Sequence, residues 1–448
     1  MKKANRVNIG MIGGGTVGSG VFHALQKNAA LMASRLGVKV SIVKVAVKAF
    51  DEPRPYAIPP SVMTLDWQEV VNDPDVHIVI ELVGGTTIAK TMVLAALKLG
   101  KPVITANKAL LAAHGPELFA AASKHNTNLY YEASVAGGIP IIKVVRESLV
   151  GNQFERIYGI VNGTCNYILT RMKREGADFA DVLKDAQRLG YAEAEPSLDV
   201  DGHDAAHKIG ILASLAHGFW VSQTDIHVEG IRAITKLDIQ FATQLGYTIK
   251  LLGIVKKVAA SAGGRKAKAA NGSQVQVSVY PTLVPDGHVL ASVSDVFNAI
   301  FVRGDVVGDT LYYGRGAGKD ATASAVLSDV ADAALDLHHS SESRVPPFVP
   351  HERHGAVQPI EDSVARYYVR LSVVDEPGVI AQVSAILGRA KISIASLIQP
   401  EGHEGDVVPL IVMMHAAPYS AMSRALRAIG QLPAVKAPPM MIRVEDFA

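Results

Sequence analysis

Short apolar runs alternate with helix-patterned stretches along the first part of the chain. The runs are rich in β-branched residues and carry few polar positions, which is typical of strands buried on both faces of a parallel sheet. Such alternation predicts an α/β fold with a Rossmann-type, doubly wound parallel sheet. The predicted strands are residues 7–12, 38–47, 76–82, 102–105 and 128–131, and the main predicted helices are residues 17–36, 87–99 and 116–124.

A different pattern begins after about residue 133. Helical and strand-like stretches are mixed here, which predicts a second domain with its own mixed α/β sheet. We expect its last helix to pack back on the first domain. The predicted helices are residues 141–149, 167–174, 179–189 and 203–217, and the predicted strands are residues 156–161, 274–283 and 306–313.

Prolines at positions 346, 347, 350 and 359, with neighbouring serines and histidines, indicate an extended linker. Beyond it, a strand pattern at 366–374, a helix pattern at 379–390 and a strand pattern at 392–398 predict a small βαβ-containing domain. We therefore divide the chain into a first domain at 1–133, a second at 134–338, a linker at 339–362 and a third domain at 363–448.

Composition narrows the possible functions. The chain has 44 basic and 42 acidic residues and a net charge of +2, so it has no general attraction to nucleic acid or anionic membrane. No apolar stretch approaches the roughly 18 residues of a membrane-spanning helix, and we find no signal peptide. The single cysteine, Cys165, excludes an internal disulfide and favours a cytoplasmic location. The basic stretch at 256–268 lacks aromatic residues, so we interpret it as a solvated loop.

A glycine-rich turn follows the first predicted strand. The sequence reads Gly-Gly-Gly-Thr-Val-Gly from Gly13, which fits G-x-G-x-x-G and opens a long predicted helix. In that context Gly13 permits a tight turn, Gly15 lets the backbone approach a pyrophosphate, and Gly18 lets the helix pack close to the strand. The phosphates would face the N–H groups of the helix start. The residues expected at this nicotinamide dinucleotide site are Gly13, Gly15, Thr16, Val17 and Gly18.

The end of the second predicted strand bears on the choice of cofactor. NAD sites usually have an acidic residue there that binds the ribose. Here the strand runs into Lys48 and Ala49, and the first acid is Asp51. Because a cation favours the 2′-phosphate of NADP, we predict NADP as the cofactor with Lys48 as a ligand. The use of NAD as well stays open.

The densest group of charges precedes the helix predicted at 203–217. Five acidic residues lie from Glu193 to Asp204, and Asp204 and Lys208 share a helix face at i, i+4 spacing. The apolar residues that follow indicate that this helix is mostly buried, where charges are costly unless they are paired or used. A desolvated lysine can exchange protons near neutral pH. Hydride transfer to a carbonyl needs such a proton donor.

A second interpretation uses the same helix. The run from His203 to His207 resembles H-E-x-x-H, in which two histidines one turn apart bind zinc and an acid acts as base. The acid here is Asp204, no third ligand is evident, and a zinc hydrolase would leave the glycine turn unexplained. We therefore keep the zinc hydrolase as the weaker alternative.

Several motifs together resemble the homoserine dehydrogenase family over nearly the whole chain. They are GGGTVG from position 13, TANK at 105–108, YEASVAGGIPII at 131–142, GIVNGTCNYIL at 159–169, the run at 190–208 and YGRGAG at 313–318. The family reduces L-aspartate 4-semialdehyde to L-homoserine on the route to threonine, methionine and isoleucine. The resemblance therefore implies an NAD(P)-dependent oxidoreductase acting on a CH–OH group. An aspartate-type amino-acid dehydrogenase is the alternative within the same enzyme class.

The resemblance also implies roles for individual residues. Lys208 would be the proton donor, and Lys108 would lie beside the nicotinamide and the reacting oxygen. Glu193, Asp199 and Asp204 match positions around the substrate amino group, whose charge must be paired when it is desolvated. Further positions match backbone contacts to the cofactor and a monovalent cation site, with sodium the expected ion. These are Gly190 and Gly318 for the cofactor, and Glu132, Val135, Gly137 and Ile139 for sodium.

The sequence departs from the family pattern at two positions that concern the site. Cys165 stands where threonine is usual, and we interpret it as a small packed side chain rather than a catalytic thiol. Lys48 and Ala49 replace a more usual Arg-Asp pair, which bears on the choice between NADP and NAD.

The third domain resembles an ACT domain with a ferredoxin-like fold. The residues Asp-Glu-Pro-Gly-Val-Ile from Asp375 lie between its first strand and first helix, the usual turn for amino-acid effectors. A helix N-terminus there could bind an effector carboxylate. The resemblance implies feedback by threonine and a homodimer or homotetramer. A domain kept for oligomerisation alone, and a non-enzymatic amino-acid sensor, are the other interpretations.

Overall fold

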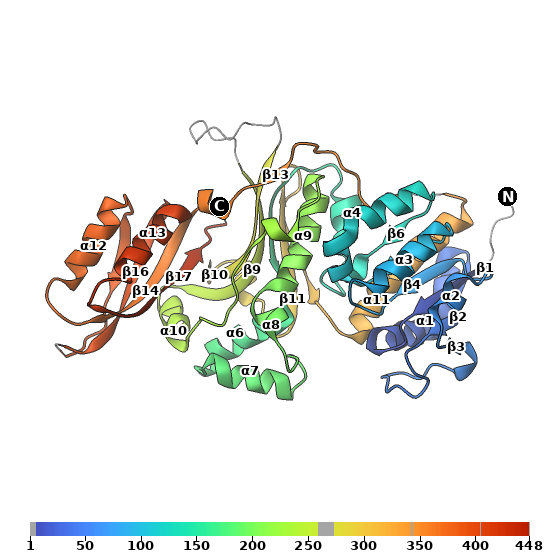
Figure 1. Ribbon diagram of the computed structural model, residues 1–448, viewed down its shortest axis with the longest axis horizontal. Helices are drawn as coiled ribbons and strands as arrows, with labels where there is room; N and C mark the ends of the chain where they lie inside the picture. Colours follow the sequence, from blue (N-terminus) through green and yellow to red (C-terminus); the bar gives the residue numbers. More distant parts are fainter. Residues whose placement is uncertain (1–5, 259–272, 342–343, 404, 448) are drawn as a thin grey trace.

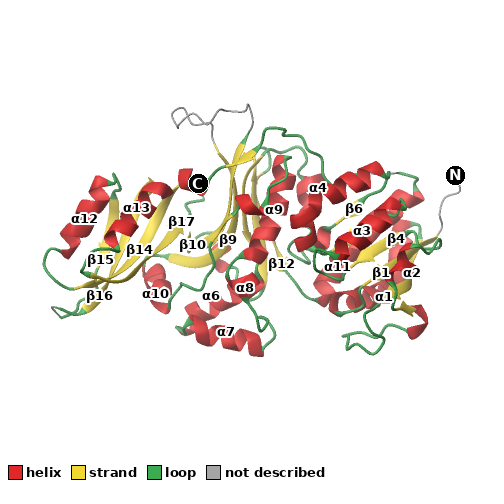
Figure 2. Cartoon of the chain, viewed as in Figure 1, coloured by secondary structure: helices red, strands yellow, loops and turns green. Residues whose placement is uncertain are grey.

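Three structural parts lie in a row along the long axis of the molecule (Figure 1). The structure, a computed structural model, describes residues 6–258, 273–341, 344–403 and 405–447. Most of the basic stretch predicted as a loop, residues 259–268, lies outside the described residues. Among the described helices, none is long and apolar enough to cross a membrane. Figure 2 shows strands in all three parts, flanked by helices.

The first part contains a six-stranded sheet in the order β3-β2-β1-β4-β5-β6. All of its pairings are parallel, as the buried apolar runs predicted. The strand order reverses between β1 and β4, which is where doubly wound sheets bind ligands. Its strands are β1 (Arg6–Ile12), β2 (Lys39–Ala46), β3 (Met63–Thr64), β4 (Ile78–Glu81), β5 (Val103–Thr105) and β6 (Leu129–Tyr130).

Helices cover both faces of this sheet. α1 (Thr16–Leu36) packs on one face together with α11 (Lys319–His338), a helix from far along the chain. An added Cβ at Gly20 would lie 2.8 Å from the Lys319 carbonyl oxygen, so only glycine permits this close approach of the two helices. The short α2 (Trp67–Val71) precedes β4, while α3 (Ile88–Lys98) and α4 (Lys108–Lys124) contribute to the core on the other side.

The start of α4 corrects the sequence prediction. The pattern placed the helix at residues 116–124, with Pro116 near its first turn, but the helix begins at Lys108 and contains Pro116. Asn107 explains the earlier start, because its side-chain oxygen accepts a hydrogen bond from Leu110 N at 3.0 Å. Such N-caps satisfy a backbone donor that would otherwise lack a partner.

A second sheet of eleven strands forms the centre of the molecule and continues into the third part, with its main path in the order β12-β11-β7-β9-β10-β17-β14-β16-β15. Within the central part, α9 (His203–His217) packs on the sheet, and Ile209 contacts the backbone of Gly253 so closely that a Cβ there would lie 3.1 Å away. The central strands are β7 (Phe154–Ile160), β8 (His227–Val228), β9 (Tyr247–Val258), β10 (Gln274–Pro285), β11 (Phe297–Gly304) and β12 (Gly308–Arg315). The other central helices are α5 (Ile141–Lys143), α6 (Gly163–Glu175), α7 (Phe179–Arg188), α8 (Ser197–Val200) and α10 (Lys236–Gln244).

Two central elements differ from the prediction. The helix expected at residues 141–149 is split into α5 and a π-helical turn at Val144–Ser148. The strand expected at 306–313 begins at Gly308 and ends at Arg315, because β12 pairs with β11 from Gly304↔Gly308 onward. Strands β9 and β11 and helix α10 were not predicted. Helix α11 is the last helix of the second domain, which was expected to pack back on the first domain but was given no residue bounds.

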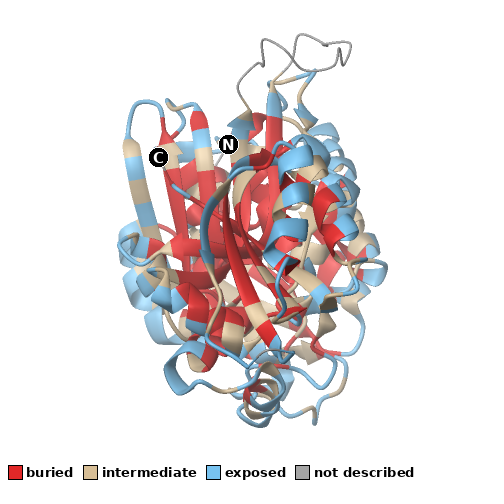
Figure 3. Ribbon diagram, turned by 90° about the vertical axis from the view of Figure 1, so that its left-hand side faces the viewer, coloured by how far each residue is buried: buried red, intermediate tan, exposed pale blue. Residues whose placement is uncertain are grey.

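The third part has two helices and four antiparallel strands in the order β17-β14-β16-β15, the ferredoxin-like arrangement. Its elements are β14 (Val364–Val374), α12 (Val379–Arg389), β15 (Ile394–Ile398), β16 (Val407–Pro418), α13 (Tyr419–Ile429) and β17 (Val435–Val444). Figure 3 shows that buried residues gather on the strands and that the outer helices are largely exposed.

The third part shares its last strand with the central sheet. β17 pairs in parallel with β10 through Thr282↔Arg443 and Leu283↔Val444. The chain after β17 then continues against the central sheet, where the Phe447 ring stacks on His288 with the ring centres 3.8 Å apart. The carboxylate of Glu445 accepts hydrogen bonds from Lys256 Nζ at 2.6 and 2.8 Å. The central part and the third part are therefore one continuous β-structure.

The proline-rich linker crosses from the first part back to the centre. The Val345 carbonyl accepts hydrogen bonds from Asn128 at 3.0 Å and Arg146 at 3.1 Å. The Phe348 ring stacks on Phe119 with 5.8 Å between ring centres. Farther along, β13 (Ala356–Val357) pairs with β10. The described residues of the linker therefore contact both the first part and the central part.

Candidate active site

The glycine turn between β1 and α1 has the geometry that a bound pyrophosphate needs. Gly13 has φ +106°, which disfavours any side chain. An added Cβ at Gly18 would lie 2.0 Å from the Gly13 carbonyl oxygen, so the turn and helix can meet this closely only with glycine there. By contrast, a Cβ at Gly15 would meet no atom within 4 Å. The open space at Gly15 lies at the start of α1, where the first N–H groups favour an anion.

The chain after β2 lies at the same edge of the sheet. Lys48 follows the strand by two residues and is exposed. Arg54 folds back over this loop, and its guanidinium donates a hydrogen bond to the Ala49 carbonyl at 2.9 Å. Tyr56 donates a hydrogen bond to Asp320 at the start of α11, at 3.1 Å. The loop therefore carries the exposed Lys48 two residues after β2 and is attached to the helix from the second domain.

Lys108 is positioned by a buried polar network at the ends of β4 and β5. Thr105 donates a hydrogen bond to Glu81 Oε2 at 2.6 Å, and the other oxygen of Glu81 accepts from Val83 N at 2.8 Å. Asn107 donates to the Gly85 carbonyl at 2.7 Å and caps α4. These contacts join two strand ends and place Lys108 as the first residue of α4.

Lys208 and Lys108 meet at one carboxylate. Asp204 Oδ2 lies 2.7 Å from Lys208 Nζ, and Asp204 Oδ1 lies 3.2 Å from Lys108 Nζ. Lys208 also donates a hydrogen bond to the Val161 carbonyl at 2.7 Å. The side chains of Asp204 and Lys208 are 7 % and 11 % exposed, whereas Lys108 is 32 % exposed. The cluster thus joins the first part, through α4, to α9 of the central part.

Asn162 connects the cluster to a second carboxylate. Its side-chain nitrogen donates hydrogen bonds to Asp204 Oδ2 at 2.9 Å and to Asp199 Oδ1 at 2.7 Å. Its oxygen accepts from Cys165 N at 2.8 Å and caps α6. Thr164 donates a hydrogen bond to the other oxygen of Asp199 at 3.3 Å. Two acidic groups and two ammonium groups are therefore fixed together around the start of α6 and α9.

The charges of this cluster have opposite effects on its two acids. Burial alone would raise the pKa of Asp204, but Lys208 and Lys108 outweigh it, so that pKa lies well below the usual range. Among the described residues, Asp199 forms no ion pair of this kind, and burial raises its pKa above the usual value. Asp204 therefore stays ionised, whereas Asp199 takes up a proton more readily. Burial also raises the pKa of the Cys165 thiol, which agrees with a packed rather than a reactive cysteine.

The other predicted substrate and cofactor residues lie at the rim. Glu193 and Gly190 are exposed in the turn between α7 and α8. In the described part of the chain, no hydrogen bond or ion pair joins the Glu193 carboxylate to the lysine cluster. Gly318 has φ +119° and precedes α11. The structure thus brings together Lys108, Asp199, Asp204 and Lys208, and leaves Glu193 apart from them.

The residues predicted to bind sodium form a buried turn. Ala136 and Gly137 both have positive φ, 55° and 49°, which is unusual for an alanine. A Cβ at Gly137 would lie 2.5 Å from the Gly316 carbonyl oxygen. The Glu132 carboxylate accepts hydrogen bonds from Ile142 N at 2.9 Å and Lys143 N at 2.8 Å. Because its side chain is engaged in this way, a cation here would be bound through backbone carbonyls, which suit a hard ion.

The zinc interpretation finds no support in the side-chain arrangement. His203 is exposed, and His207 lies on the helix between Asp204 and Lys208. Across the described residues, no three or more His, Cys, Asp or Glu side chains are placed to hold a metal ion. The acid that would serve as base, Asp204, is already paired with two lysines.

The turn from Asp375 lines a concave site on the third part. Gly378 has φ +92° and precedes α12, so the first N–H groups of that helix open onto the site. Gln399 donates a hydrogen bond to Asp375 at 2.8 Å. The site is lined by Val374, Asp375, Glu376, Pro377, Gly378, Val379, Ile380 and Gln399.

Asn162, which joins the two acids of the candidate site, was not predicted. Its position before a helix is a usual N-cap pattern, so the cap could have been found from the sequence. Its contacts to Asp199 and Asp204 span 37 and 42 residues, and no local pattern reports them. Glu81 was missed for a similar reason, because it looks like the polar end of an apolar strand.

Comparisons with known proteins agree along the whole chain. The chain matches the families described as "Homoserine dehydrogenase, NAD binding domain" over residues 13–132, "Homoserine dehydrogenase" over 140–331 and "ACT domain" over 367–432. It is 44 % identical to a homoserine dehydrogenase of Synechocystis, covering 98 % of this chain and 99 % of that protein.

Solved structures give the same result. A homoserine dehydrogenase from Thiobacillus denitrificans is similar at a TM-score of 0.90 and 40 % identity, with all of both chains covered. A hyperthermophilic archaeal homoserine dehydrogenase in complex with NADPH is similar at a TM-score of 0.59 and 27 % identity, covering 74 % of this chain and 98 % of that one.

Proposed function

The chain belongs to the homoserine dehydrogenase family, and we propose how its own residues carry out the family reaction. It is an NAD(P)-dependent oxidoreductase that interconverts L-aspartate 4-semialdehyde and L-homoserine in the biosynthesis of aspartate-family amino acids. The observation that carries the proposal is the meeting of Lys108, Asp204 and Lys208, because it sets two ammonium groups beside the cofactor-binding sheet.

Lys208 is the proposed proton donor to the aldehyde oxygen. An ammonium group has three N–H bonds, and two of these are directed at Val161 and Asp204. The third remains for a substrate oxygen. Asp204 holds the ammonium in this orientation, and Lys108, which is more exposed, assists at the same oxygen. In the direction of homoserine oxidation, the same lysine receives the hydroxyl proton.

The substrate ammonium is the proposed partner of the remaining acids. Asp199 is held by Asn162 and Thr164 through its oxygens and forms no ion pair with any described residue, so a substrate ammonium would supply a positive partner. Glu193 is exposed and available to a ligand at the rim. Asp204 would be shared between the substrate and the lysines.

The cofactor is proposed to be NADP, with NAD as a second possibility. The glycine turn would hold the pyrophosphate at Gly13, Gly15, Thr16, Val17 and Gly18, and Gly190 and Gly318 would contact the cofactor through their backbones. Lys48 supports NADP, because its exposed ammonium follows the second strand where a 2′-phosphate is bound. The similar archaeal enzyme was solved with NADPH. When bound, the nicotinamide supplies or accepts the hydride.

A sodium ion is proposed at the turn that contains Glu132, Val135, Gly137 and Ile139. The support is the pair of buried residues with positive φ, because backbone strain of this kind is retained where a structure holds a ligand. The ion would stabilise the connection between β6 and α5. It would thereby support the packing of the first part on the central part.

The ACT domain binds a small-molecule effector by its family character, and we propose threonine as that effector. The turn from Asp375 and the start of α12 offer N–H groups to the effector carboxylate. We further propose a homodimer or homotetramer that acts in the cytoplasm on small molecules, without nucleic acid or membrane partners. The balanced charge supports the absence of a nucleic-acid partner, and no described helix is long and apolar enough to cross a membrane. The oligomeric state and the location are what the family resemblance implies.

One assay tests the function. The purified protein should reduce NADP when L-homoserine is added, as measured by the absorbance of the reduced cofactor. L-aspartate at the same concentration should give no reduction. Reduction with aspartate and none with homoserine would instead identify an aspartate-type amino-acid dehydrogenase.

A further inference from the structure

The segment from His227 to Asp238 connects the third part of the molecule to the loop that carries Asp199. One side of it packs on that loop, residues 197–202. Ile231 N donates a hydrogen bond to the Val200 carbonyl at 2.8 Å. Arg232 forms an ion pair with Asp201 and donates a hydrogen bond to Ser197 Oγ at 2.9 Å.

The backbone of the 227–238 segment packs against the backbone of the 197–202 loop with no room for a side chain between them. An added Cβ at Gly230 would lie 2.3 Å from the Val200 carbonyl oxygen and 2.5 Å from the Asp201 Cα. The 197–202 loop contains Asp199 and leads directly into α9, which carries Asp204 and Lys208. A displacement of the 227–238 segment therefore displaces the loop that holds Asp199.

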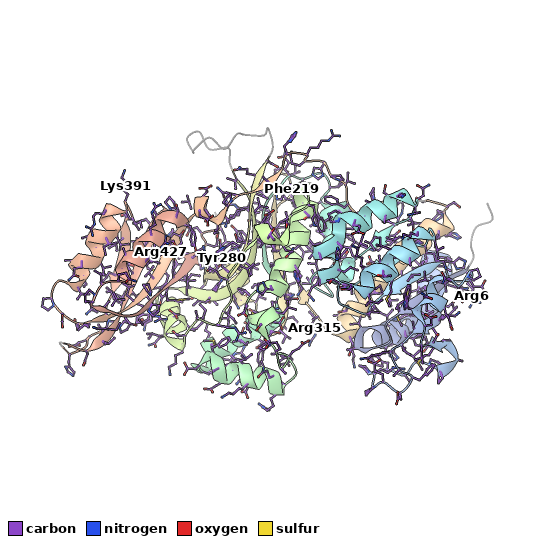
Figure 4. The ribbon with its side chains drawn as sticks, viewed as in Figure 1. Arg6, Phe219, Tyr280, Arg315, Lys391 and Arg427 are labelled. Atoms are coloured by element: carbon purple, nitrogen blue, oxygen red, sulfur yellow. The ribbon has the colours of Figure 1, made fainter. Side chains whose placement is uncertain are left out.

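The ACT domain holds the same segment at two points, through the buried Arg443 and the partly buried Arg370. Arg443 of β17 is 1 % exposed and forms an ion pair with Glu229 at 2.9 Å. Its guanidinium lies over the ring of Tyr280, 4.1 Å from the ring centre; Tyr280 is labelled in the central sheet in Figure 4. Glu229 also contacts His227 at 2.6 Å, so the first end of the segment is fixed to β17.

The second point lies at the start of α10. Arg370 of β14 donates hydrogen bonds to both oxygens of Asp238, at 2.7 and 3.1 Å, and Tyr368 donates another at 3.2 Å. Asp238 is fully buried and forms a capping box with Thr235. Separating a buried pair of this kind leaves an uncompensated charge, which is strongly unfavourable. The segment must therefore follow the ACT sheet when that sheet moves.

Strand β14, whose Arg370 and Tyr368 bind Asp238, also leads to the turn that starts at Asp375, the proposed effector site. β14 runs from Tyr368 and Arg370 to Val374, and the turn that lines the concave ACT site follows at Asp375. Asp375 N donates a hydrogen bond to the Asp406 carbonyl at 2.8 Å, which ties this turn to the residues before β16. A ligand bound at the Asp375 turn therefore contacts the end of β14, the strand whose Arg370 binds the 227–238 segment.

We propose that the 227–238 segment couples the ACT domain to the 197–202 loop, so that the state of the ACT sheet sets the affinity for the substrate. The proposal rests on the proposed effector site and names the route to the catalytic cluster. It concerns the amino-acid substrate, because the segment contacts the Asp199 loop and not the glycine turn. The KM for homoserine should therefore respond, and the KM for the cofactor should not.

A double-mutant cycle in the full-length chain tests the coupling without any effector. Arg370→Lys perturbs the ACT end and keeps a cation beside Asp238, and Arg232→Met perturbs the loop end at an exposed site. Each should raise the KM for homoserine about threefold or more, and the double variant should show much less than the product of the two effects, as expected for one network. The cofactor KM serves as the internal reference.

Arg366→Lys is the matched control. Arg366 lies on the same strand, but its partner is Asp446 at 2.7 Å rather than the segment. This change should leave the homoserine KM within about twofold and combine with Arg232→Met as a simple product, as distant independent sites do. If Arg370→Lys behaves in the same way, the proposal is wrong.

Threonine then separates this proposal from the proposed effector. In the parent protein, threonine should raise the homoserine KM, and Arg232→Met should reduce that effect at least about threefold while calorimetry still detects threonine binding. If threonine neither binds nor affects the parent protein, the proposed effector is wrong, and the mutant cycle still decides the coupling. An undiminished threonine effect in Arg232→Met would overturn the coupling even if threonine is the effector.

Discussion

Replacing Lys208 by methionine tests the proton-transfer geometry most directly. Methionine retains an unbranched apolar chain in a site where the lysine side chain is only 11 % exposed, so the packing of α9 should survive. The substitution removes the ammonium group that lies 2.7 Å from both Val161 O and Asp204 Oδ2. The proton donor is then lost, and Asp204 loses one of its charged partners.

The loss of catalytic rate and the loss of folding stability should differ in size. A positioned general acid contributes about 10²- to 10⁴-fold to the rate, so kcat should fall by at least about 100-fold, or about 2.7 kcal/mol at about 1.36 kcal/mol per factor of ten. Lys108 and Asn162 still contact Asp204. The stability loss should therefore be about 1.5–3 kcal/mol, as for a hydrogen bond to a charged group, rather than the about 3–5 kcal/mol of an unpaired buried charge.

Steady-state rates of homoserine oxidation and thermal unfolding measure both effects on the same preparation. Lys90→Met is the control, because Lys90 forms an ion pair with Glu117 at 2.7 Å on the first domain, away from the cluster. That variant should keep kcat within about twofold of the parent protein. A folded Lys208→Met protein with kcat within tenfold of the parent protein would refute the role of Lys208 as proton donor.

Four further outcomes are expected. Burial raises the pKa of Glu132 from 4.5 to about 7, so the folded state binds this proton more tightly than the unfolded state, and the free energy of unfolding should fall by about 3 kcal/mol from pH 4.5 to 7. Denaturant unfolding at several pH values should show a weaker fall in Glu132→Gln, and an unchanged fall would exclude Glu132 as the titrating group. Gly15→Ala should keep the melting temperature but raise the cofactor KM, whereas Gly18→Ala should lower the melting temperature by overpacking against backbone. Equal melting temperatures of the two variants would contradict the open space at Gly15 and the close backbone contact at Gly18. Lys48→Ala should raise the KM for NADP relative to that for NAD, and an unchanged ratio would exclude Lys48 as the 2′-phosphate ligand. Added threonine should lower initial rates most at homoserine concentrations below the KM, and rates that stay unchanged at all homoserine concentrations would end the threonine proposal.

Local patterns were sufficient for the glycine turn and for five of the six strands of the first sheet, whereas the two-residue β3 was not predicted. Strands β1, β4, β5 and β6 are largely buried, so apolar residues dominate their sequences and distinguish them from the helices between them. The turn at Gly13 is a contiguous motif whose meaning depends only on the strand before it and the helix after it. Lys208 and Asp204 also lie one helical turn apart, so their contact was visible in the spacing.

Contacts between distant segments were not visible in the same way. Lys108 reaches Asp204 from another domain, and the sequence suggested this only through the family resemblance. The helix Lys319–His338 carries many alanines and is buried along much of its length, so its pattern lacks a clear polar face. The prediction of a separate third domain also missed the pairing of β10 with β17, because parallel pairing across 160 residues leaves no mark on either strand.

The end of β17 and the residues after it also bear on how the protein is made. Phe447 packs on His288, Glu445 pairs with Lys256, and Arg443 pairs with Glu229, so the central sheet is completed by residues that a ribosome produces long after β10. Until then the nascent chain carries a β10 edge without its β17 neighbour and a set of aromatic residues without their cover, both of which favour association with other chains. One face of the sheet of the first domain also stays partly uncovered until α11 has been synthesised. We therefore expect synthesis to outpace folding in this protein, with cooperative folding delayed until residue 447 has emerged.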